Sequence, residues 1–153
     1  HETTSSIICE LLDADLQGKS VLDMGCGTSI LAILASMRGA HPVTAIDIDD
    51  WCVNNSRDNI ELNGIHNITV ELGNAHLLEG RKPFDVIIAN INRNILLADM
   101  DRYAACMHQG SELFMSGFYV QDIPAIREKA ESLGMTFVHH REKNNWAAVK
   151  FVM

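Results

Sequence analysis

Short apolar runs alternate with amphipathic segments along most of the chain. Apolar runs bounded by Gly, Asn or Asp predict strands, whereas apolar residues three and four positions apart predict helices. The run Phe84–Asn90 is almost continuously apolar, which is typical of a strand buried on both faces. The pattern predicts strands at 21–24, 43–48, 68–72, 84–90 and 112–116, helices at 3–14, 30–38, 93–107 and 121–133, and a further helix that Asp50 caps and that stops at Asn63-Gly64.

The last two apolar segments, 136–142 and 146–152, are separated only by Lys143-Asn144-Asn145. This connection is too short for a crossover helix, so the two segments are predicted to pair as an antiparallel hairpin. Five alternating strand and helix units followed by such a hairpin predict an α/β fold with a doubly wound sheet of seven strands. At 153 residues the chain is predicted to form one domain.

A glycine turn follows the first strand and carries the strongest chemical signal in the sequence. Gly25 and Gly27 lack a Cβ atom, so the turn can bend sharply and let backbone N–H groups approach a ligand. Asp47 is predicted at the end of the next strand, where a carboxylate can accept hydrogen bonds from both hydroxyls of a ribose. Asp23 precedes the turn and is placed to receive an ammonium group. Together these residues predict a nucleoside-binding βαβ unit.

The spacing within the turn favours S-adenosylmethionine over NAD as the cofactor. A dinucleotide fingerprint, G-x-G-x-x-G/A, needs a third small residue to pack the helix against the strand. That position is Ile30 in this chain. The C-terminal hairpin also separates the Rossmann-like sheet of class I methyltransferases from dehydrogenase sheets. The sequence therefore predicts a methyltransferase that depends on S-adenosylmethionine.

Further candidate residues are predicted at the same edge of the sheet. Ile48 follows Asp47, and Asn74-Ala75 follows the third strand, where this fold usually binds adenine. Asn is also common in turns, so both interpretations of Asn74 stay open. Asn90 ends a buried strand, where an unpaired amide is costly, and is interpreted as the active-site residue that holds the cofactor or the target amine. No lone His, Asp or Glu is an obvious general base.

Other residues carry weaker signals. Thr3 and Thr4 can be ordinary N-cap residues of the first helix. Trp51 either packs over the adenine or covers the edge of the sheet. Side chains of adjacent strand residues face opposite sides, so His139-His140 is predicted to have surface and core roles rather than a catalytic one.

Composition narrows the possible partners and the compartment. Acidic residues number 20 against 12 basic ones, giving a net charge of −8, which argues against direct nucleic-acid binding and suits a small molecule or a basic protein. No apolar stretch approaches the roughly 20 residues of a membrane span, and no signal peptide is visible. The four cysteines, Cys26 among them, are scattered without metal-ligand spacing. Reduced thiols in a cytoplasmic protein without a metal site are the simplest interpretation.

Several motifs together resemble a known family, the PrmA methyltransferases, which act on a bacterial large-subunit ribosomal protein. The matching motifs are the H-x-T-T opening at His1, the V-L-D-x-G-C-G turn region from Val21 to Leu31, Asp47-Ile48-Asp49, the helix end from Asn59 to Asn63-Gly64, Ala89-Asn90-Ile91, and Ser116-Gly117. The H-x-T-T opening is the most specific, because most methyltransferases lack it. The match runs nearly from end to end.

The resemblance implies a function and a division into domains. It implies N-methylation of lysine side chains and the N-terminal amine of a ribosomal protein, with Thr4 at the methionine end of S-adenosylmethionine. Thr3 belongs to the same expected cofactor site. Residues 1–153 would be the catalytic domain, and the family's N-terminal substrate-recognition domain would be absent from this chain.

Two departures from the family pattern accompany the resemblance. The family's G-S-G reads Gly27-Thr28-Ser29, so a position that favours a free backbone carries a side chain. After Asn90-Ile91 the family usually has Leu-Ala, whereas this chain has Asn92-Arg93. Two alternatives stay open at this point: a nucleic-acid or small-molecule methyltransferase of the same fold, and a cofactor-binding module without catalysis.

Overall fold

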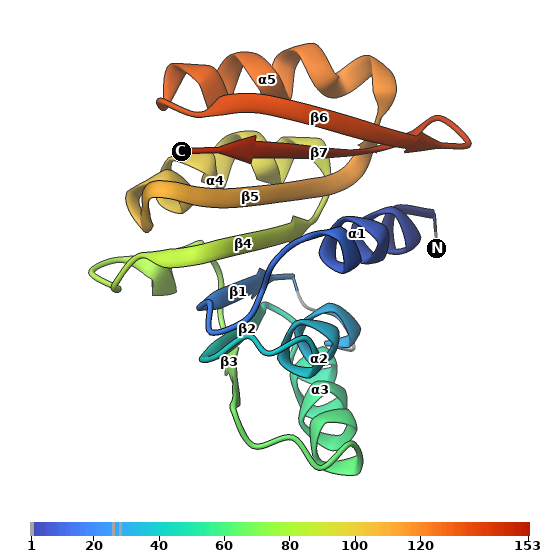
Figure 1. The fold of residues 1–153 in the computed structure, drawn as a ribbon, viewed down its shortest axis with the longest axis vertical. Coiled ribbons are helices and arrows are strands. Elements are labelled where there is room, and N and C mark those ends of the chain that lie inside the picture. Colours follow the sequence, from blue (N-terminus) through green and yellow to red (C-terminus); the bar gives the residue numbers. More distant parts are fainter. Residues whose placement is uncertain (1, 26, 28) are drawn as a thin grey trace.

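The computed structural model describes residues 2–25, 27 and 29–153. In this part of the chain seven strands form one sheet, with helices on both of its faces (Figure 1). The strands are β1 (Val21–Met24), β2 (Val43–Asp47), β3 (Ile68–Leu72), β4 (Phe84–Asn90), β5 (Met107–Tyr119), β6 (Thr136–Lys143) and β7 (Trp146–Val152). The helices are α1 (Glu2–Asp13), α2 (Ile30–Met37), α3 (Asp50–Leu62), α4 (Arg93–Ala105) and α5 (Ile123–Ser132), with short 3₁₀ helices η1 (Ala75–Leu78) and η2 (Val120–Asp122).

The order of the strands confirms the predicted doubly wound sheet and its terminal hairpin. The order is β3-β2-β1-β4-β5-β7-β6. The first five strands pair in parallel, whereas β7 pairs antiparallel with both β5 and β6. The hairpin therefore folds back so that its second strand enters the sheet beside β5 and its first strand forms the edge.

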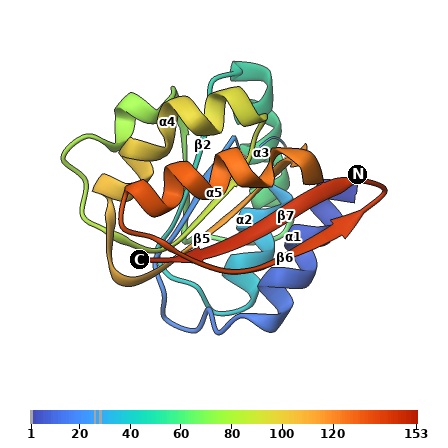
Figure 2. The same ribbon diagram turned by 90° about the horizontal axis from the view of Figure 1, so that it is seen from above.

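The helices cover the two faces in separate layers. Helices α1, α2 and α3 pack on one face through an apolar cluster that includes Ile7, Leu31 and Val53. Helices α4 and α5 cover the other face, where Leu96 and Ile126 join the second apolar cluster. Figure 2 shows α4 and α5 on one side of the sheet and α1 and α2 on the other. Neighbouring residues of β1 and β4 contribute to opposite clusters, which explains why both strands are apolar almost throughout.

Strand β5 is longer than the sequence predicts, because tertiary hydrogen bonds recruit a polar segment. The predicted strand covers 112–116 and the predicted preceding helix extends to 107, but the helix ends at Ala105 and the strand begins at Met107. Ser111 accepts a hydrogen bond from the His108 N–H at 2.9 Å and donates one to the Phe84 carbonyl at 2.7 Å. These partners lie outside the local apolar pattern, so the pattern alone misses the extension.

The cap of α3 is Asp49 and not Asp50, which is the first helical residue. Asp49 has extended backbone angles, and its Oδ1 accepts a hydrogen bond from the Trp51 N–H at 2.9 Å. Only a residue outside the helix can turn its side chain back to the first free N–H groups. As a result β2 ends at Asp47, and two residues separate that strand end from the body of α3.

Candidate active site

The carboxyl ends of the central strands meet at one edge of the sheet and surround a hollow of about 280 Å³. Small-molecule sites begin at about 300 Å³, so the size suits part of a nucleoside-type ligand. Five of the predicted site residues line the hollow together with residues from other elements. The predicted members are Gly25, Asp47, Ile48, Asn74 and Ala75, and the others are Met24, Ile46, Gly73, Ile91, Ile95 and Asp99.

Three of the six lining residues that the sequence did not predict, Ile91, Ile95 and Asp99, form one wall of the hollow. They follow β4 or lie on the first half of α4. Ile95 is 42% exposed although it is large and apolar. An apolar residue near the start of a helix that follows a central parallel strand is the signal that would have revealed this wall of the hollow.

Asp47 holds the glycine turn in place. Its Oδ2 accepts a hydrogen bond from the Gly27 N–H, and its Oδ1 accepts one from the Asp49 N–H, both at 2.9 Å. Ser56 of α3, which was not predicted, donates a hydrogen bond to the Gly27 carbonyl at 2.8 Å. Each carboxylate oxygen has a second lone pair, so Asp47 can accept from a ribose while it holds the turn.

Asp23 is a buried carboxyl group beside this turn. It is 1% exposed, and neither of its oxygens has a hydrogen-bond partner among the described residues. Burial raises the pKa of Asp23 to about 7, the charge of Asp47 adds to the rise, and the nearby backbone N–H of Ala32 opposes it. An unpaired buried carboxylate is costly, so this group fits the ammonium that the sequence predicts for it.

Ser29 occupies a left-handed backbone conformation, with φ 63° and ψ 23°. This is the position where the resembling family has glycine. The residue is buried, and its hydroxyl has no partner among the described residues. Ser29 is also the N-cap of α2 without a side-chain capping bond. The predicted departure at Ser29 is therefore a strained position, whereas the neighbouring Cys26 and Thr28 lie outside the described residues.

We expect Ser29→Gly to raise the free energy of unfolding by about 1–4 kcal/mol. Left-handed backbone costs an L-residue about 1–2 kcal/mol and a buried unpaired hydroxyl about 1–3 kcal/mol, whereas the added freedom of glycine in the unfolded chain costs about 0.4–1 kcal/mol. Urea denaturation measures the change. Ser132→Gly in the last turn of α5 is the control, and this substitution should lower the free energy of unfolding. Equal destabilisation by both substitutions contradicts the strain at Ser29.

Asn90 forms a second polar group with residues from two other elements. It is in register with Ser116 of β5, whose hydroxyl donates to Asn90 Oδ1 at 2.9 Å. Asn90 Nδ2 donates to Thr4 Oγ1 at 3.4 Å, although 86 residues separate the two in sequence. Thr3 is buried beside Thr4 in the first turn of α1, so neither residue is an N-cap. Ser116 is fully buried and fixes the orientation of the Asn90 amide.

Gly117 permits the close approach of β5 to the segment that follows Asn90. Its φ is +101°, and a Cβ atom there would lie 2.5 Å from the carbonyl oxygen of Ile91. The Ile91 N–H donates a hydrogen bond to the Ser116 carbonyl at 3.0 Å. Because Ile91 also lines the hollow, this contact joins the polar group at Asn90 to the hollow.

The remaining predicted residues have ordinary explanations or lie elsewhere. Asn74 caps η1 by accepting a hydrogen bond from the His76 N–H at 2.9 Å, which confirms the turn interpretation, and it also lines the hollow, so its contact with adenine stays a prediction. Trp51 is 69% exposed and is not part of the hollow's lining. Both His139 and His140 are exposed, so the predicted core role of one of them is wrong.

Across the described residues no three His, Cys, Asp or Glu side chains gather as metal ligands, and no helix is long and apolar enough to cross a membrane.

The sheet order and the position of the hollow define a class of protein. Dinucleotide-binding sheets have the order 3-2-1-4-5-6, whereas here an antiparallel strand enters between the last two positions. This is the Rossmann-like fold of class I methyltransferases. A magnesium protoporphyrin IX methyltransferase from Synechocystis, solved with bound S-adenosylmethionine, shares it: TM-score 0.79, 20% identity, 98% of this chain and 77% of the other covered.

The chain belongs to the ribosomal protein L11 methyltransferase (PrmA) family, whose model matches residues 1–153. The ribosomal protein L11 methyltransferase of Phocaeicola vulgatus is 87% identical over the whole chain, which covers 54% of that relative. A ribosomal protein L11 methylase structure from Lactobacillus delbrueckii subsp. bulgaricus has a TM-score of 0.91 and 27% identity, over 97% of this chain and 77% of the other. The chain spans about half the length of the curated relatives that it matches.

Proposed function

We propose that the chain transfers methyl groups from S-adenosylmethionine to amine nitrogens of ribosomal protein L11. The observation that carries the proposal is the position of the Asn90 amide at the end of β4, next to a nucleoside-sized hollow. Membership of the family and the names of the relatives agree with this substrate. The acidic net charge of −8 also suits a basic ribosomal protein.

The cofactor residues divide between the two ends of S-adenosylmethionine. We assign Asp47 to the ribose hydroxyls, and Ile48, Asn74 and Ala75 to the adenine. At the methionine end, we assign Asp23 to the ammonium, with Gly25 and Gly27 in the turn beside it. Thr3, Thr4 and Asn90 complete this end of the site.

Asn90 orients the target amine. S-adenosylmethionine supplies an activated methyl group on a sulfonium, so the residues of the chain need only align a neutral amine behind it. Asn90 Oδ1 already accepts from Ser116 and has a second lone pair for an amine N–H. Lysine has a pKa of about 10.4 in water, and a desolvated site favours its neutral form. Asn90 cannot take a proton, so the amine releases it to water on entry.

We assign the entry of the target chain to a second hollow of about 490 Å³, which is lined by the residues that follow Asn90 and by the end of β5. Tyr119 and Trp146 stack with ring centroids 4.3 Å apart in its wall. Aromatic faces attract a lysine ammonium or its methylated form. The stretch directly after Asn90, Ile91-Asn92-Arg93, has no aromatic residue to stack a flipped base, which makes a nucleobase target the weaker proposal.

We further propose that residues 1–153 are the catalytic domain and that the region of the relatives outside the match contributes substrate recognition. Losing such a region lowers the rate, because its binding energy positions the target amine. Ribosomal proteins of bacteria are made and assembled in the cytoplasm, so the proposed substrate places the reaction there.

The experiment combines binding and turnover. Calorimetry should show that S-adenosylhomocysteine binds the chain and that NAD does not, because Ile30 occupies the small third position of the dinucleotide fingerprint. Labelled S-adenosylmethionine should then methylate ribosomal protein L11, more slowly with this chain than with the longer Phocaeicola vulgatus relative. Binding without transfer by either protein supports the non-catalytic module instead. Equal rates contradict the proposed domain division, and tighter binding of NAD contradicts the cofactor.

A further inference from the structure

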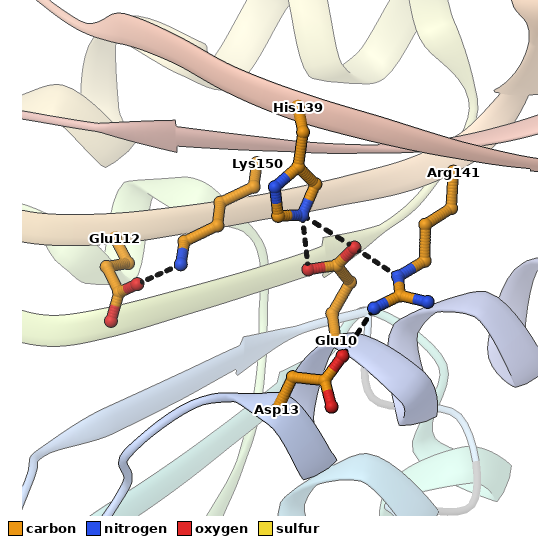
Figure 3. A network of polar contacts seen from close by, with 6 residues as sticks. All are labelled: Glu10, Asp13, Glu112, His139, Arg141 and Lys150. Atoms are coloured by element: carbon orange, nitrogen blue, oxygen red, sulfur yellow. Dashed lines mark hydrogen bonds and ion pairs between the residues drawn. The ribbon is translucent and has the colours of Figure 1, made fainter.

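A network of charged side chains joins α1 to the terminal hairpin (Figure 3). Glu10 of α1 is buried, with its side chain only 3% exposed. The Arg141 Nε donates to Glu10 Oε1 at 2.6 Å, and His139 Nε2 lies 2.8 and 2.9 Å from the two carboxylate oxygens. The same guanidinium pairs with Asp13 one turn later, at 2.5 Å. Two turns of the helix are therefore attached to β6.

A further contact attaches the beginning of the helix. Asn144, in the turn of the hairpin, donates to Glu2 Oε1 at 3.2 Å. Between these polar contacts Ile7 and Leu11 are fully buried and pack in the core beneath. Apolar packing permits small shifts of a helix along a sheet, whereas directional contacts at both ends fix its position along β6.

The position of α1 matters because its first turn belongs to the candidate active site. Thr4 Oγ1 lies 3.4 Å from Asn90 Nδ2, near the outer limit for a hydrogen bond. Glu10 is six residues further along, which corresponds to about 9 Å along the helix axis. A small displacement of α1 toward or away from β4 would therefore make or break the contact at Thr4 while the core under the helix stays packed.

Stability alone is a poor reason for a buried carboxylate at this place. Removing a carboxylate from water costs several kcal/mol, and apolar residues of similar volume often stabilise a protein equally well or better. Arg141 offers a planar fork that binds Glu10 and Asp13 together, which defines a direction as well as a contact. The geometry of the network is suited to specify one placement of the helix.

We infer that Glu10 is a positioning residue: its contacts with Arg141 and His139 place α1 on the hairpin so that Thr4 meets Asn90 at the methionine end of the cofactor. The inference rests on the proposed cofactor site. It also gives the terminal hairpin a role in the site, although neither β6 nor β7 lines the nucleoside hollow.

The test is a double-mutant cycle on the affinity for S-adenosylhomocysteine. Glu10→Met replaces the carboxylate by an apolar side chain of similar length, and should weaken binding about three- to tenfold while the protein stays folded by circular dichroism. In a Thr4→Ala background the same substitution should have almost no further effect, because its influence passes through Thr4. Arg141→Lys keeps the charge but loses the fork, and serves as a milder variant should Glu10→Met fail to fold.

Glu131→Met is the matched control. It removes the exposed ion pair between Arg127 and Glu131 on α5, at 3.1 Å, and should leave the affinity unchanged. Additive effects of Glu10→Met and Thr4→Ala, or unchanged affinity in a folded Glu10→Met protein, overturn the positioning role. If the unsubstituted chain fails to bind S-adenosylhomocysteine, the proposed cofactor site is wrong, which is a different outcome from either of these.

Discussion

Asp23→Asn is expected to weaken binding of S-adenosylhomocysteine by about a hundredfold or more. The buried carboxylate lacks a partner among the described residues, and the ammonium of the ligand is the charge assigned to it. Leaving one member of a buried ion pair without its partner costs about 3–5 kcal/mol, and about 2.7 kcal/mol already corresponds to a hundredfold change in affinity. Calorimetric titration at pH 8 measures the loss.

The same substitution is expected to stabilise the ligand-free protein at alkaline pH. The Asp23 carboxyl loses its proton near pH 4 in the unfolded chain and near pH 7 in the folded one. Below pH 4 both states hold the proton. As the pH rises from 4 to 7 only the unfolded state releases it, so the free energy of unfolding falls, by a total on the order of 4 kcal/mol, and above pH 7 it stays low. The amide of the variant does not titrate and has no such loss, so denaturation at pH 8 should show the variant to be more stable.

Ligand binding should follow the same titration. At pH 6 most of the folded protein carries a protonated Asp23 that must release its proton before it pairs with an ammonium. Affinity for S-adenosylhomocysteine should therefore rise about tenfold between pH 6 and pH 8, and this rise should be absent in Asp23→Asn. A pH profile that is the same in both proteins contradicts the assignment of Asp23 to the ammonium.

The fold could be predicted almost completely, because the central strands β1, β2 and β4 are buried on both faces and the apolar runs of the sheet are short and well bounded. The sequence pattern misplaces two boundaries, and only the first depends on a partner distant in sequence. Residues 107–111 join β5 only because Ser111 bonds to Phe84 on the neighbouring strand. The cap of α3 was placed one residue late, since two consecutive aspartates give the same local signal and only the backbone angles of Asp49 distinguish them.

Some residues of the candidate site also follow from the local sequence pattern, whereas others depend on contacts between distant elements. Asp47 and the glycine turn follow from the local strand–turn–helix pattern, and the structure places Gly25 and Asp47 together at the hollow. Thr4 and Asn90 could be joined only through the family resemblance, because no local pattern relates the first helix to the end of β4. Ser116 and Glu10 act through contacts with residues from other elements, and their own surroundings in the sequence carry no signal of it.

Asp47→Ala should lower the affinity for the cofactor, whereas Asp49→Ala should lower the stability of the protein. Asp47 accepts from Gly27 and faces the hollow, so its loss removes the ribose acceptor and the support of the glycine turn. Losing a charge-assisted hydrogen bond costs roughly 1.5–3 kcal/mol, which weakens binding of S-adenosylhomocysteine about ten- to a hundredfold.

Asp49 instead caps α3 through the Trp51 N–H, and its substitution should lower the free energy of unfolding by about 1 kcal/mol with little change in affinity. Calorimetry and urea denaturation on both variants separate the two effects. The backbone N–H of Asp49 bonds to Asp47 whatever its side chain, so Asp49→Ala preserves the support that Asp47 receives. Equal losses of affinity in the two variants would mean that the ribose is bound by the whole strand end and not by Asp47 in particular.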